Sequence, residues 1–170
     1  IAVCIEIFRF SICFGIEDTF YTKKQIRQRL NIPVLGLWYQ LDNHHDGEEE
    51  LQTSLAVQSV MNQDVIFVDI INGNYAEQFY EQYTSIFSSK ENGSLQTISY
   101  PIIRQEEYDK LENANVILVI PFGVPCANQA EDIVCELQRR NCHIAGAVLT
   151  NCNYKWVKAY YNKFSTERGK

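Results

Sequence analysis

The sequence predicts a three-layer α/β fold, in which a mainly parallel sheet carries helices on both faces. Three runs, at residues 65–68, 116–120 and 144–149, are apolar throughout instead of alternating with polar residues. Segments with apolar residues at helical spacing separate these runs. Only strands buried on both sides can dispense with polar alternation, so the pattern favours parallel strands between two layers of helices.

The chain has the size and composition of one globular domain, or of one domain with an appendage. Its 170 residues are enough to bury about 70% of the unfolded surface. Apolar residues make up 46% and charged residues 21%, which excludes a disordered or collagen-like protein. The net charge of -6 argues against a nucleic-acid partner, because neutralising phosphates requires a basic face.

The cysteines contain no C-x-x-C pair and lie mostly within apolar runs. This pattern is typical of reduced, buried thiols rather than of a disulfide framework. The six residues are Cys4, Cys13, Cys126, Cys135, Cys142 and Cys152.

Residues 1–18 form an apolar segment that we expect to lie close to a membrane. Twelve of the first sixteen residues are apolar, but Glu6 and Arg9 interrupt them. A free-standing membrane helix needs about 20 mostly apolar residues, so this segment alone is too short and too charged. It is interpreted as the end of a membrane helix or as a helix buried against a partner. A core element of a soluble domain is the alternative.

The residues that follow support a membrane-proximal position. Positive charge next to an apolar segment marks the cytoplasmic side of a membrane. Four basic residues stand there, namely Lys23, Lys24, Arg27 and Arg29. We therefore expect an α/β cytosolic domain over residues 19–165 and a frayed tail over residues 166–170.

The first elements follow from capping and turn residues. Thr22 and Gln25 form a capping box that begins a short helix, and Asn31 and Pro33 end it. A strand is expected at residues 37–39. The polar and acidic stretch at residues 41–50 indicates a loop.

The middle of the chain alternates helix and strand. A helix is expected from about residue 49 to 61, and the apolar strand at 65–68 ends in Asp69. A turn at 72–74 precedes a helix from about 75 to 87, with Phe79 and Tyr83 on one face. A loop at 88–94, a moderate strand at 95–100 and a short helix at 106–113 follow.

The last third contains the strongest strand, at residues 116–120. Pro125, at a first helical position, is expected to begin a helix that stops near Asn141. The apolar residues of that helix recur at helical spacing: Ala127, Ala130, Ile133, Val134 and Leu137. A buried strand at 144–149 and a helix from about residue 153 complete the chain.

Ligands of doubly wound folds bind beyond the carboxyl ends of the strands. In this chain those ends are residues 69–74, 121–125 and 150–153. Asp69 lies where such folds place functional carboxylates, and the cap of a helix or turn is the alternative interpretation. Asp69, Asn72, Gly73 and Asn74 are therefore the candidates for a phosphate-binding loop, in degenerate form.

Two groups of residues carry a family pattern. The first comprises residues 17–19, Thr22, Ile26, Leu30 and residues 32–36 (IPVLG). It resembles the segment after the second membrane helix of bacterial polysaccharide chain-length determinants. The second, residues 112–123 and 140–151, is similar to the last strand-helix-strand unit of the tyrosine kinases of capsule and exopolysaccharide export.

This resemblance implies a P-loop-like domain at the cytoplasmic face of the bacterial inner membrane. It also implies homo-oligomerisation, polysaccharide assembly or export proteins as partners, and attachment to the membrane through the N-terminal segment. Tyr154, Tyr160 and Tyr161 weakly resemble the C-terminal tyrosine cluster of the family, which makes them candidate phosphoacceptors. Buried or interfacial aromatics on a terminal helix are the alternative interpretation.

The phosphate-binding string of that family, G-x-x-x-x-G-K-[ST], is absent from this sequence. The corresponding strand, turn and helix would run from Val65 to Glu77 and contain one Gly, no Lys and no Ser or Thr. A second register places Glu48 where the Lys belongs, which would repel a polyphosphate. Asp69 is followed by Ile70 and Ile71, so the second acidic residue of the metal site is missing too. We therefore expect neither ATP nor Mg²⁺ as a cofactor.

The sequence accordingly favours a non-catalytic regulator of capsular or exopolysaccharide chain length or export, which acts by oligomerising and docking partners. One alternative is a divergent ATP-binding tyrosine kinase or ATPase that a partner chain completes. Another is a soluble α/β domain of unrelated role.

Two other clusters are interpreted as structural. His44, His45 and Asp46 lie in an acidic stretch without a rigid frame for a metal, which favours a hydrated loop. Cys142 and His143 are adjacent on a strand, so their side chains point to opposite faces and cannot form a nucleophile and base pair.

Overall fold

The computed structural model describes residues 18–39, 48–60, 64–86, 96–99 and 105–167. The apolar segment expected at residues 1–18 therefore lies outside the described residues, except for Asp18. Among the described helices, none is long and apolar enough to cross a bilayer.

Five strands form one sheet in the order β1-β5-β4-β2-β3, and every neighbouring pair is parallel. The strands are β1 (Val34–Tyr39), β2 (Val65–Asp69), β3 (Gln96–Ser99), β4 (Asn115–Pro121) and β5 (His143–Cys152). The expected α/β class with a parallel sheet is confirmed. β2 and β4 are buried along their whole length, which is the burial that their continuous apolar sequence predicts.

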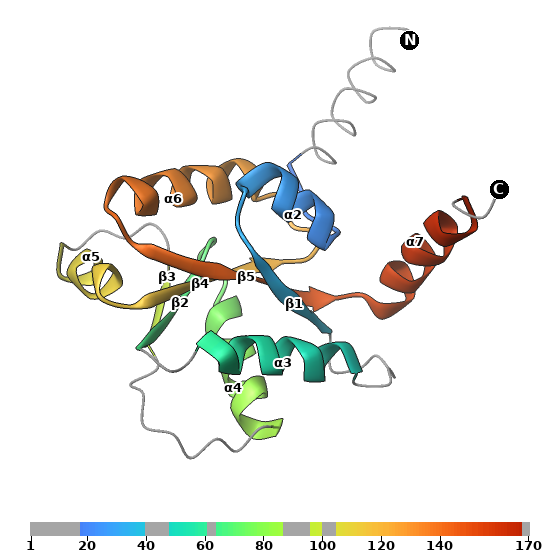
Figure 1. Cartoon of the computed structure of the whole chain (residues 1–170), viewed down its shortest axis with the longest axis horizontal. Coiled ribbons are helices and arrows are strands. Elements are labelled where there is room, and N and C mark those ends of the chain that lie inside the picture. The colour runs from blue at the N-terminus through green and yellow to red at the C-terminus, as the bar shows by residue number, and fades with distance from the viewer. Residues whose placement is uncertain (1–17, 40–47, 61–63, 87–95, 100–104, 168–170) are drawn as a thin grey trace, which may run out of the picture.

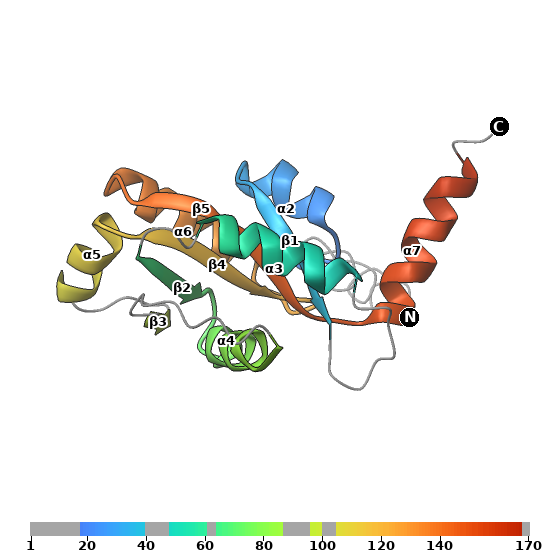
Figure 2. The same cartoon turned by 60° about the horizontal axis from the view of Figure 1, so that its bottom comes forward.

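Helices cover both faces of this sheet (Figure 1). They are α2 (Lys23–Leu30), α3 (Glu48–Val60), α4 (Tyr75–Ile86), α5 (Gln105–Glu112), α6 (Ala127–Arg139) and α7 (Tyr154–Glu167). Figure 2 shows α3 and α4 on one side of the sheet, with α2 and α6 on the other. α7 extends from the end of β5 at the edge of the domain (Figure 1).

Successive residues of each strand point to opposite layers, as the pleat requires. Ile66 and Val68 belong to the core under α2, α5 and α6, whereas Val65 and Phe67 belong to the core under α3 and α4. In the core under α3 and α4, most of the large side chains that the helices contribute are aromatic. Phe79 of α4 lies edge-on to Trp38 of β1, with ring centroids 5.0 Å apart.

α2 forms as its capping box predicts. The Oγ1 of Thr22 accepts a hydrogen bond from the N–H of Gln25, and Gln25 Oε1 accepts one from the N–H of Thr22. Asn31 ends the helix in the left-handed conformation, with φ of 53°. Ile26 and Leu30 are buried and fix the helix on β1 and α6.

Several expected boundaries are wrong. β1 begins at Val34 rather than at residue 37, α3 begins at Glu48 inside the stretch expected as a loop, and β5 ends at Cys152 rather than at residue 149. Pro125 does not occupy a first helical position, because α6 begins at Ala127 with Cys126 as its N-cap. Pro125 instead pairs with Thr19 in an isolated antiparallel bridge. The five apolar residues expected to bury this helix are all buried: Ala127, Ala130, Ile133, Val134 and Leu137.

Candidate functional site

The carboxyl ends of β2, β4 and β5 meet at one edge of the sheet, because all three strands are parallel neighbours. Backbone hydrogen bonds join the turns there. The N–H of Phe122 donates to the carbonyl of Thr150 at 2.9 Å, and the N–H of Ile70 donates to the carbonyl of Val119 at 3.5 Å. This edge is the expected ligand-binding position of a doubly wound fold.

Asp69, the last residue of β2, points its carboxylate at the N-terminus of α4. Its Oδ2 accepts hydrogen bonds from the N–H of Tyr75 at 2.6 Å and from the N–H of Ala76 at 3.4 Å. The side chain is 1% exposed. Asp69 is therefore a helix cap, which is the alternative that the sequence left open, and it occupies the position where a helix N-terminus would otherwise bind an anion.

The turn residues bring further N–H groups toward the same carboxylate. The N–H of Gly73 donates to the carbonyl of Ile71 at 2.7 Å, which tightens the turn, and Asn74 is left-handed, with φ of 56°. Asn72 and Asn74 are exposed, whereas Gly73 is half-buried. The candidate loop thus forms a cradle of N–H groups, but Asp69 fills it.

Burial dominates the electrostatics of Asp69. It raises the pKa of this carboxyl above the ordinary value of 3.8, and hydrogen bonding by the N–H groups of Ala76, Tyr75, Ile71 and Gly73 opposes that effect. The second oxygen, Oδ1, is also buried and has no hydrogen-bond partner of normal geometry among the described residues. Because burial outweighs these hydrogen bonds, the charge of the carboxylate is costly in the folded state.

The Asp69→Asn variant is expected to be more stable than the wild type at pH 7. The pKa of the Asp69 carboxyl is higher in the folded protein than in the unfolded chain. This carboxyl therefore favours folding most at a pH below its pKa in the unfolded chain. Its contribution falls as pH rises through that value and is fully lost above the folded pKa. The amide of the variant keeps an acceptor for the N–H of Tyr75 without the buried charge. Thermal melts should show a Tm increase of about 2–4 °C at pH 7, which shrinks toward acid pH. A lower Tm for the variant at pH 7 would show that the ionised cap is net stabilising.

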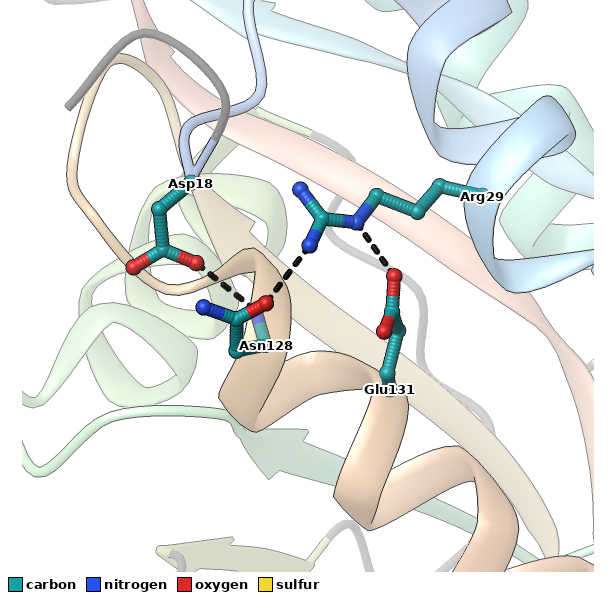
Figure 3. Close-up of polar contacts among 4 residues, drawn as sticks. All are labelled: Asp18, Arg29, Asn128 and Glu131. Atoms are coloured by element: carbon teal, nitrogen blue, oxygen red, sulfur yellow. Dashed lines mark hydrogen bonds and ion pairs between the residues drawn. The ribbon is translucent and has the colours of Figure 1, made fainter. Parts of the chain in front are cut away.

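A second helix N-terminus at this edge is capped in the same manner. The Oδ1 of Asp18 accepts a hydrogen bond from the N–H of Asn128 at 2.8 Å, in the first turn of α6 (Figure 3). The carbonyl of Asp18 accepts two more, from the N–H groups of Cys126 at 2.8 Å and Ala127 at 2.9 Å. The chain that enters the domain thus satisfies three of the N–H groups that begin α6.

Arg29 of α2 also binds the first turns of α6, close to the position where Asp18 caps that helix. Its guanidinium donates to Asn128 Oδ1 at 2.7 Å and forms an ion pair with Glu131, also on α6 (Figure 3). Both partners are partly exposed, so the ion pair itself contributes little stability. Its effect is positional, because it keeps α2 and the N-terminus of α6 beside the entering residue Asp18.

The third strand end, after β5, leads directly into α7. Asn153 Oδ1 accepts a hydrogen bond from the N–H of Trp156 at 3.1 Å, so a side chain of this protein caps that helix too. Tyr154 lies edge-on to Tyr39, and Tyr160 stacks on Trp156 with ring centroids 5.2 Å apart. The side chain of Tyr161 lies outside the described residues. The two described candidate phosphoacceptors are thus placed in aromatic contacts.

The thiols at and near this edge are mostly buried. Cys126, Cys142 and Cys152 are buried, and burial, with Asp18 nearby, raises the pKa of Cys126 to about 12. Cys126 is therefore a poor nucleophile at neutral pH. Cys135 is exposed, so the expectation of a buried thiol is wrong there, because it lies on the outer face of α6.

Alkylation of the folded protein should follow this burial. At pH 8 iodoacetamide is expected to modify Cys135 at least about tenfold faster than Cys126, Cys142 or Cys152. The three slower thiols are buried, and burial also raises the pKa of Cys126 and of Cys142. Peptide mapping by mass spectrometry, with unfolded protein as the control, measures each rate. Equal rates at Cys126 and Cys135 would contradict the burial of the α6 N-terminus.

Other candidate chemistry finds no support in the described part of the chain. No three His, Cys, Asp or Glu side chains there are grouped to hold a metal ion. His44, His45 and Asp46 lie outside the described residues. Cys142 is buried and lies just before β5, so the expectation that it shares a strand with His143 is wrong. His143 is exposed and contacts Asn115 through Nδ1 at 2.6 Å.

Sequence reasoning missed the cap that Asp18 provides. Its partners Cys126, Ala127 and Asn128 are more than a hundred residues away along the chain. A capping residue usually precedes its own helix, so the local pattern around Asp18 contains no sign of this contact. Asp69, by contrast, could be identified because it ends a buried strand and precedes a helix.

Comparison with known proteins adds no relative. No protein-family model, no curated protein and no solved structure matches this chain.

Proposed function

We propose that this chain is a non-catalytic regulator of capsular or exopolysaccharide chain length or export. In this proposal it works at the cytoplasmic face of the bacterial inner membrane, where it oligomerises and docks polysaccharide assembly or export proteins. The observation that carries the non-catalytic part is the capping of α4 by Asp69, whose buried carboxylate occupies the anion position beyond β2.

A triphosphate at that position would meet a carboxylate instead of open N–H groups. Phosphate-binding loops balance several negative charges with backbone N–H groups, a Lys and a metal ion. Here Asp69 takes the N–H groups of Tyr75 and Ala76. The sequence from residue 64 to 89 contains neither Lys nor Arg. Both facts favour a domain that keeps an α/β scaffold without nucleotide chemistry.

The regulatory part rests on the resemblance of residues 17–36 to chain-length determinants and on how that segment is attached. Asp18 is fastened to the N-terminus of α6, and Arg29 joins α2 to the same helix. A change in the direction of the preceding segment would therefore act on α6 and α2 directly. Such a connection suits a regulator in which a conformational change at the membrane alters how partners dock on the α/β domain.

Two measurements test the proposal. In the bacterium that carries the gene, deletion should shift the size distribution of its exported polysaccharide, and re-expression of the full-length protein should restore it. An unchanged distribution would overturn the polysaccharide role.

The purified chain should form the same oligomer in sedimentation velocity with and without Mg-ATP. A nucleotide-dependent oligomer would favour the alternative of a kinase or ATPase completed by a partner chain.

A further inference from the structure

The first two turns of α7 present a basic, solvent-exposed face. Lys155, Trp156, Lys158 and Ala159 are exposed, whereas Val157 is buried against the domain. Trp156 is 39% exposed, although it is one of the largest apolar side chains of the protein. Around the helix Lys155 lies between Lys158 and Trp156, because successive residues are about 100° apart. A large exposed aromatic ring beside cations is a common feature of surfaces that bind at a membrane interface.

The charge of the chain is unevenly distributed. Residues 153–170 contain five basic residues and one acidic residue, a net charge of +4. Since the whole chain has a net charge of -6, the rest of it has a net charge of -10. A long anionic ligand would therefore be repelled by most of the domain and attracted by this C-terminal segment, whose helix α7 contributes three Lys and one Glu.

The basic face lies beside the point where the chain enters the domain. Trp156 stacks on Tyr21, with centroids 5.0 Å apart, and meets Phe122 edge-on at 5.4 Å. Thr19, two residues before Tyr21, pairs with Pro125. The apolar segment of residues 1–16 thus joins the domain within a few residues of the ring that α7 exposes.

We infer that the exposed face of α7 binds the surface of an anionic lipid bilayer, with Lys155 and Lys158 facing the headgroups and Trp156 at the interface. This inference rests on the proposed membrane-associated function and adds the lipid chemistry that α7 recognises. An anionic bilayer fits better than an acidic protein, because the adjoining N-terminal residues are apolar and Trp favours the headgroup region.

Vesicle binding by the full chain tests the inference. Vesicles of phosphatidylglycerol and phosphatidylcholine are compared with vesicles of phosphatidylcholine alone, by co-sedimentation at low and physiological salt. The variant Lys155→Gln/Lys158→Gln should bind the anionic vesicles about 10- to 30-fold more weakly than the wild type. Lys110→Gln, an exposed position on α5 at the other end of the domain in Figure 1, is the matched control and should bind like the wild type.

Tryptophan fluorescence gives a second readout that the N-terminal segment alone would not produce. Trp38 is 2% exposed, so quenching by acrylamide reports mainly on Trp156. Anionic vesicles should protect Trp156 from acrylamide and shift its emission to the blue. Protection that is equal with zwitterionic vesicles, or equal binding by the double Gln variant, would overturn the inference.

A negative result in the vesicle experiments can be distinguished from a failure of the proposed function. The polysaccharide and oligomer measurements do not depend on the charge of α7. A chain that oligomerises without nucleotide and controls polysaccharide size, yet ignores anionic vesicles, would overturn the lipid inference alone.

Discussion

Replacing Phe79 with Ala is expected to lower the free energy of unfolding by about 3–5 kcal/mol. Phe79 is 1% exposed and lies at the centre of an aromatic cluster, with ring centroids 5.0 Å from Trp38, 5.5 Å from Phe67 and 6.0 Å from Tyr83. The loss combines apolar transfer with a cavity among stiff rings. Because a domain is typically stable by about 5–15 kcal/mol, chemical denaturation should show a much lower midpoint.

The Phe79→Leu variant is the control for this measurement. It retains an apolar group of intermediate size and should lose about 1.5 kcal/mol or less. The result matters for function because α4 is the helix that follows β2, at the position of the missing phosphate loop. If Phe79→Ala changed stability by less than about 1 kcal/mol, α4 would not be held by the aromatic core.

The second large effect is expected for Gly36→Ala, about 3 kcal/mol of lost stability. A Cβ at Gly36 of β1 would lie 1.8 Å from Thr53 Oγ1 and 2.6 Å from its Cβ, so α3 cannot keep its approach to the strand. Thr53 is fully buried and donates a hydrogen bond from Oγ1 to the carbonyl of Leu37 at 3.0 Å. The added methyl group must therefore displace the helix or break this bond.

Chemical denaturation of three variants separates the causes. Ser59→Ala, on the exposed side of α3, should stay within about 0.5 kcal/mol of the wild type. Thr53→Ala should lose about 1 kcal/mol through its hydrogen bond, less than Gly36→Ala loses through the clash. A Gly36→Ala protein as stable as the wild type would contradict the close packing of α3 on β1.

The layers and strands were predictable because they depend on local patterns. The apolar runs that become β2, β4 and β5 have too few polar positions for a half-exposed sheet, and the capping box at Thr22 determines where α2 begins. The start of α6 was mispredicted because Pro125 can take either of two structural roles. It can begin a helix, but here it pairs with Thr19 from the distant N-terminus.

The site was predictable only in part, for the same reason. The position of Asp69 follows from the end of β2, and its role as a cap was one of two interpretations. The cap that Asp18 provides to α6 and the stacking of Tyr21 on Trp156 join residues far apart in sequence. No periodicity reports such contacts, so the coupling between the entering chain, α6 and α7 required the structure.

The central claim is that side chains of this protein already occupy the anion-binding positions at the carboxyl edge of the sheet. Titration of the purified full chain with millimolar Mg-ATP, followed by thermal denaturation and calorimetry, tests it most directly. We predict no saturable heat and an unchanged Tm. Saturable binding, with a gain of about 2.7 kcal/mol at 100 times the dissociation constant, would contradict it.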